Sequence, residues 1–157
     1  QIPIAVFMLA YLAFALRRFL GLHWILVVLG VLAFYATLQY AGTIQCQQAG
    51  LLPITARTGA RCLNGSIGYL PAGIVLAIMA VTLAALRHPA WRALGLASVV
   101  FLASLTFRTL DIEICELTRI GGRLWGSHFL WHVLNALTLY LLLRAAVRHG
   151  APRTARR

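Results

Sequence analysis

Residues 67–86 read IGYLPAGIVLAIMAVTLAAL, twenty positions without a charged side chain, and Arg87 and His88 follow directly. A helix of that length is about 30 Å long, which is the thickness of the hydrocarbon core of a bilayer. Because lipid offers no partner to backbone N–H and C=O groups, an apolar run inside a bilayer must be helical. This stretch therefore predicts a transmembrane helix.

Four further apolar runs surround this one, and the five together predict an all-α, polytopic membrane helix bundle over residues 1–147. None of the runs has the charged stripe at a 3.6-residue period that marks a surface helix of a soluble protein. A loop over residues 42–66 and a basic tail at residues 148–157 complete the chain. The expected helices lie near residues 2–19, 23–41, 67–87, 92–115 and 124–147.

The composition of the chain favours the same class. Of the 157 residues 61% are hydrophobic and 11% are charged, whereas a soluble domain carries roughly 25% charged residues. The net charge is +11, but all 14 basic residues are arginines and most of them flank apolar runs. This distribution is typical of a protein whose partner is the lipid bilayer. It argues against a nucleic-acid-binding surface, which would need a basic polar face.

The arginines also predict an orientation. If five helices alternate in direction, nine of the arginines lie at the end of the bundle that holds the tail. The other five lie at the opposite end with all three acidic residues, which are Asp111, Glu113 and Glu116. By the positive-inside rule we expect the C-terminal tail to be cytoplasmic and the loop at 42–66 to face outside.

The outside loop contains Cys46 and Cys62. In an oxidising compartment we expect a disulfide between them, which would close a loop of about 15 residues and contribute roughly 3 kcal/mol. Two unpaired thiols are the alternative. Cys115 has no obvious partner in the sequence.

The first apolar run is too short to cross a bilayer comfortably. Residues 2–16 would form a helix of only about 22 Å. The chain begins at Gln1 and not at Met, without the basic region or the cleavage site of a signal peptide. We expect the native protein to continue upstream of Gln1.

Two histidines stand one helical turn apart in the last run, where residues 126–135 read GSHFLWHVLN. His128 and His132 share a helix face at a spacing that lets two imidazoles bind one metal ion, and we expect both rings to point into the bundle. An ionisable pair inside a membrane is costly and is usually functional. The alternative is two neutral histidines that hydrogen-bond to neighbouring helices.

The preceding run carries Arg108 and Asp111, three positions apart and close enough to pair on a helix. An ion pair between them that ties the helix ends together is slightly favoured. The alternative is that Asp111 accepts a hydrogen bond from a metal-bound histidine and so orients that ligand. Arg108 and Asp111 are thus candidates for supporting a site, and no residue is assigned as catalytic.

These residues suggest a family. The stretches FRTLDIEIC at 107–115, GSHFLWH at 126–132 and LNAL at 134–137 resemble the end of the alkaline ceramidase family. That family belongs to a wider group of seven-helix membrane hydrolases that includes the adiponectin receptors. The stretches IPI at 2–4 and NGSIGYLP at 64–71 look like its bacterial members. The resemblance therefore implies a protein of the bacterial inner membrane.

The resemblance also implies a zinc ion held by three histidines and hydrolysis of a lipid amide such as ceramide. His128 and His132 match the two ligands that the last helix supplies. The third histidine of the family lies on an earlier helix, in a motif that this sequence does not contain. The five helices would then be the last five of seven.

Two other classes of function compete with the hydrolase. The chain holds only two of three ligands, so a non-catalytic subunit of a larger membrane assembly is the alternative. A haem-binding electron carrier would need histidines on different helices at matching depth. His23, His88 and His149 are expected at the end of the bundle opposite His128 and His132, which disfavours a haem site.

Overall fold

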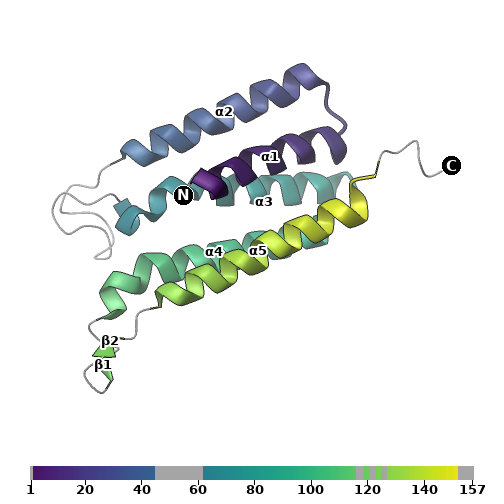
Figure 1. Cartoon of the computed structure of the whole chain (residues 1–157). Coiled ribbons are helices and arrows are strands. Elements are labelled where there is room, and N and C mark those ends of the chain that lie inside the picture. Colours follow the sequence, from purple (N-terminus) through teal and green to yellow (C-terminus); the bar gives the residue numbers. More distant parts are fainter. Residues whose placement is uncertain (1, 45–61, 116–118, 121–122, 125–126, 152–157) are drawn as a thin grey trace.

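The structure is a computed structural model of the 157-residue chain. It describes the backbone of residues 2–44, 62–115, 119–120, 123–124 and 127–151 and the side chains of residues 4–44, 62–111 and 127–151. Almost all of the described chain is helical (Figure 1). The elements in chain order are α1 (Ile2–Arg18), α2 (Trp24–Thr43), η1 (Cys62–Tyr69), α3 (Leu70–Ala85), α4 (Trp91–Cys115), β1 (Arg119–Ile120), β2 (Arg123–Leu124) and α5 (His128–His149).

Four helical stretches of the described chain are long and apolar enough to cross a membrane. They are Trp24–Thr43, Cys62–Ala85, Trp91–Asp111 and His128–His149. These four stretches indicate an integral membrane protein and confirm the all-α class. The expected count of five is not confirmed, because α1 has 17 residues and is not among them.

The helix α3 begins later than expected, and an irregular segment precedes it. The helix expected near 67–87 covers 70–85 as α3, and Pro71 stands in its first turn, where a missing N–H costs nothing. The 3₁₀ segment η1 precedes it. Leu63, Asn64 and Gly65 in η1 have φ values of 54°, 53° and 83°. Three successive residues in this left-handed region prevent a continuous helix through η1.

The last helix also begins later than expected, at His128 and not near residue 124. Leu124 belongs instead to the two-residue strand β2, which pairs antiparallel with β1 so that Arg119 lies opposite Leu124. This strand pair was not expected from the sequence. The shorter helix places His128 in the first turn of α5, at the edge of the bundle.

The core lies between α3, α4 and α5, with α4 in the middle, and Ala15 of α1 joins it. Leu83 of α3 and Leu94 and Ala97 of α4 have no exposed surface. A small residue such as Ala97 lets membrane helices approach closely. The buried Ser104 hydroxyl of α4 donates a hydrogen bond of 3.0 Å to the Trp131 carbonyl of α5. This contact fixes α5 against α4 at the level where the candidate site begins.

Candidate metal centre

The two histidines of α5 share one face of the helix, as the spacing predicted. The ring centroids of His128 and His132 are 5.0 Å apart and the rings are inclined at 76°. Both side chains are exposed, that of His128 at 51%, so neither ring is packed in the core of the described residues. That both rings point into the bundle stays a prediction. Trp131, beside them in the sequence, is 3% exposed. The pair therefore lies at the edge of the buried face of α5.

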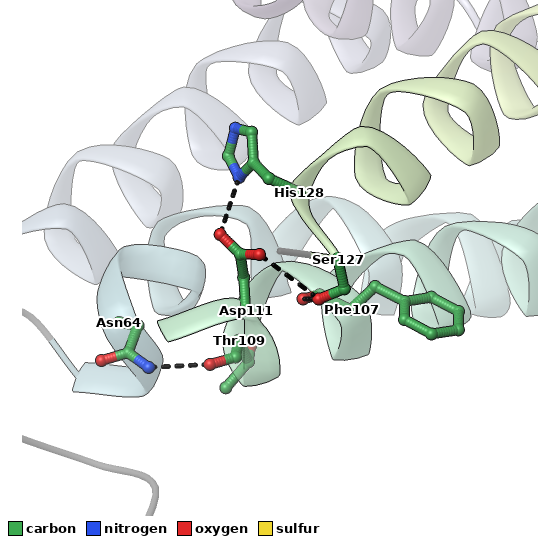
Figure 2. A network of polar contacts seen from close by, with 6 residues as sticks. All are labelled: Asn64, Phe107, Thr109, Asp111, Ser127 and His128. Carbon is green, nitrogen blue, oxygen red and sulfur yellow. Dashed lines mark hydrogen bonds and ion pairs between the residues drawn. The ribbon is translucent and has the colours of Figure 1, made fainter. Parts of the chain in front are cut away.

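Asp111 of α4 faces the start of α5 (Figure 2). Its Oδ2 atom lies 3.5 Å from Nδ1 of His128, and its Oδ1 atom lies 3.5 Å from the Ser127 hydroxyl. The same hydroxyl donates a hydrogen bond of 3.0 Å to the Phe107 carbonyl. Proximity of a carboxylate to Nδ1 favours the tautomer with a proton there, which leaves Nε2 of His128 free to bind a metal.

Arg108 does not pair with Asp111, so the slightly favoured expectation is wrong. Its guanidinium carbon lies 5.0 Å from the ring centroid of Tyr69 and 5.1 Å from that of Trp131. Two aromatic ring faces attract the cation, while Asp111 makes its contact with His128. The geometry corresponds to the alternative in which Asp111 orients a histidine.

The segment η1 contributes to this end of the bundle in a way that the sequence reading missed. The Asn64 side chain donates a hydrogen bond of 2.7 Å to the Thr109 carbonyl of α4 (Figure 2). This bond holds Gly65 beside Arg108, where a Cβ atom on Gly65 would lie 3.7 Å from Nη2. The signal in the sequence was the Asn-Gly pair, which readily adopts positive φ.

An apolar pocket of ≈ 80 Å³ lies among the five helices α1 to α5. Asn135 and Leu139 line it from α5, on the stripe that begins with His128 and His132. The Tyr11 hydroxyl of α1 is buried with no hydrogen-bond partner among the described atoms, and Tyr11 also lines the pocket. The histidine pair thus lies on a helix face that continues into an apolar space between helices.

His128 and His132 could supply part of the ligand set of a zinc site. Two imidazoles one turn apart match two of the three protein ligands that a catalytic zinc uses. Within the side chains described, no group of three or more His, Cys, Asp or Glu residues could hold a metal. The side chains of Glu113, Cys115 and Glu116 lie outside that set.

Cys62 is buried at the start of η1, 2% exposed, and is disulfide-bonded. Cys46 and Cys115 both lie outside the described side chains. The pairing of Cys62 with Cys46 therefore stays a prediction.

Comparisons of the chain with protein-family models, with curated proteins and with solved structures gave no match. The family resemblance of residues 107–115 and 126–137 therefore stays an expectation.

Proposed function

We propose that the protein is a zinc-dependent hydrolase of lipid amides that works at the membrane, with His128 and His132 as two of three zinc ligands. The observation that carries the proposal is the contact of Asp111 with Nδ1 of His128, 3.5 Å away, beside a second imidazole. Metal-binding histidines almost always donate their other ring N–H to an acceptor, and a carboxylate is one of the common acceptors. A histidine pair that serves only packing has no need of it.

Zinc held by three histidines supplies an acidic bound water and polarises a carbonyl oxygen. The protein's own part is to hold and orient the ligands. Asp111 fixes the ring of His128 through Nδ1, and the Ser127 hydroxyl lies within 3.5 Å of the other carboxylate oxygen. A site with this support keeps its ligand in one orientation, which raises metal affinity.

The apolar pocket supports a substrate with an acyl chain. Phe7, Leu76 and Phe101 line it with apolar surface, and Asn135 lies in its lining on the histidine stripe of α5. An amide carbonyl at the histidine pair would place an attached acyl chain along this pocket. The Asn135 side chain can donate to and accept from an amide at that level.

The proposal includes five membrane-spanning helices, a cytoplasmic tail and the bacterial inner membrane. The 17 residues of α1 would span about 26 Å, only a few ångströms less than the hydrocarbon core. A modest mismatch of this kind is accommodated by local thinning of the bilayer.

A non-catalytic membrane subunit is the second candidate. It is favoured by the exposure of His128 and by the lack of a third ligand among the described side chains. In that case the exposed face of α5 would pack against another subunit, and the histidine pair would hydrogen-bond across that interface.

Zinc binding separates the two candidates. The full-length native protein in detergent is titrated with Zn²⁺ in competition with a fluorescent chelator, as wild type, His132→Ala and His23→Asn. His23 caps α2 and Asn retains capping ability, so His23→Asn is the matched control. We expect one zinc per chain, at least about 10-fold weaker binding by His132→Ala, and no change in the control. Equal binding by all three proteins would contradict the hydrolase and favour the subunit.

Hydrolysis is the second readout. Native protein taken from membranes is incubated in liposomes with a fluorescent N-acyl sphingosine. We expect release of the acyl chain by wild type and none by His128→Ala. Zinc binding without release of the acyl chain would reject N-acyl sphingosines as the substrate.

A further inference from the structure

Arg108 has hydrogen-bonding capacity that the described part of the protein does not use. A guanidinium carries five N–H donors and no acceptor. Its Nε atom is buried with no hydrogen-bond partner among the described residues. The acid one turn away, Asp111, contacts His128 instead. A cation near the end of the apolar span Trp91–Asp111 is thus left without an anionic partner in the described structure.

The aromatic contacts stabilise the positive charge of Arg108 but do not accept hydrogen bonds from its N–H groups. Arg108 lies 5.0 Å from the Tyr69 ring and 5.1 Å from the Trp131 ring, and these two rings contact each other with centroids 5.3 Å apart. Ring faces attract a cation but do not replace oxygen acceptors for the N–H groups. The rings therefore hold the guanidinium in place while its donors stay available.

Arg108 lines a pocket of ≈ 270 Å³ between α1, α2 and η1, separate from the apolar pocket beside Asn135. The wall of this pocket has two kinds of surface. Met8 and Leu9 of α1 are apolar, while Tyr35 and Gln39 of α2 carry polar groups. No carboxylate is among the described residues that line it, so none of them compensates the positive charge of Arg108.

We propose that this pocket binds the phosphate of an anionic lipid, with Arg108 as the anion-binding residue. A planar guanidinium suits the oxygens of a phosphate and binds them through paired N–H donors. The apolar wall from α1 provides a surface for the first methylene groups of the acyl chains, which favours a lipid over free phosphate. The inference does not rest on the proposed hydrolase, because it uses neither the histidine pair nor a metal.

Lipid binding by the purified chain tests this inference. The protein in detergent is titrated with dioctanoyl phosphatidic acid, with dioctanoyl glycerol and with inorganic phosphate, and bound molecules are counted by native mass spectrometry. Arg108→Gln removes the charge. Arg92→Gln is the matched control, because Arg92 also lies over a tryptophan ring, 5.5 Å from that of Trp91, but is exposed and lies at the other end of α4.

We expect wild type and Arg92→Gln to bind one phosphatidic acid with equal affinity and Arg108→Gln to bind it roughly 10- to 100-fold more weakly, the loss typical of a hydrogen bond to a charged group. Ala5→Phe, which fills the pocket from α1 and keeps Arg108, should weaken binding as well. If circular dichroism shows that Arg108→Gln has lost its helices, Ala5→Phe alone tests whether the pocket binds the lipid.

Three outcomes would overturn the inference. The first is that Arg108→Gln binds phosphatidic acid as tightly as wild type does. If Arg108→Gln misfolds, the corresponding outcome is that Ala5→Phe binds it as tightly as wild type does. The second is binding of dioctanoyl glycerol as tight as that of phosphatidic acid, which would remove the role of the phosphate. The third is inorganic phosphate that binds as tightly as the lipid, which would identify free phosphate as the ligand.

Discussion

At the scale of single residues, the site depends on Asp111. This side chain is 20% exposed near the end of an apolar helix, where an unpaired carboxylate is costly. Its contacts are with His128 and Ser127, the residues at which α5 begins. The carboxylate therefore couples α4 to the first turn of α5 and orients an imidazole at the same time.

Asp111→Asn tests that role. The amide keeps the shape of the side chain but loses the charge that favours a proton on Nδ1 of His128. We expect zinc affinity to fall roughly 10- to 100-fold, as it does when a carboxylate behind a metal ligand is lost. Zinc titration measures this, with Thr106→Ala, an exposed change on the same helix, as the control. An unchanged affinity would show that Asp111 has only a structural role.

The residues of the site were predictable, but their partners were not. The spacing of His128 and His132 fixes a shared helix face, because it follows from the helix period alone. The spacing of Arg108 and Asp111 equally allowed a pair, yet each has its partner on another element. Such contacts depend on how helices pack and on side-chain rotamers, and neither is encoded in the spacing along one helix.

At the scale of elements, the ends of helices were the hardest feature to predict. Apolar runs locate the helices of a membrane bundle well, because length and hydropathy are enough. The strand pair before α5 had a signal of its own, since Gly121-Gly122 separates Ile120 from Arg123 and such a pair favours a tight hairpin. The irregular η1 likewise follows from Asn64 and Gly65.

Gly65→Ala tests whether the left-handed backbone of η1 is required. Gly65 has φ +83°, a conformation in which an L-residue with a Cβ atom is strained by about 1–2 kcal/mol. We expect this variant to unfold at a lower temperature in detergent, followed by circular dichroism. Gly95→Ala is the control, because Gly95 lies within α4 with open space around its Cα, so alanine there should be neutral or stabilising by about 0.5–1 kcal/mol. Equal melting temperatures for the two variants would contradict the requirement.

At the scale of the whole molecule, the described chain has an apolar exterior. Large apolar side chains such as Val147, Tyr40 and Val81 are 85%, 72% and 70% exposed. A soluble monomer rarely exposes contiguous apolar surface on this scale, whereas a helix in lipid does. Composition predicted this feature directly. The number of spans was less predictable, because α1 is close to the length at which a helix just crosses the core.

The number of spans can be measured through the positions of the two chain ends. The basic ends of α1 and α5 meet on one side of the bundle, where Phe19 contacts the His88 ring and His88 contacts the His149 ring. If α1 crosses the bilayer, an epitope placed before Gln1 therefore lies on the side opposite the tail. If only the four longer stretches cross, both ends lie on the same side.

We expect the first result, with the tail on the cytoplasmic side. Arg17 and Arg18, in the last turn of α1, are the only charged residues among its 17. By the positive-inside rule they favour placing this end of α1 on the same side of the membrane as the arginines after α3 and in α5. In intact bacterial cells with a permeabilised outer membrane, an antibody should then reach the N-terminal epitope and not a C-terminal one. Access to the C-terminal epitope should require lysis of the inner membrane. Protection of both epitopes until lysis would mean that α1 does not cross, and exposure of the C-terminal epitope alone would reverse the orientation.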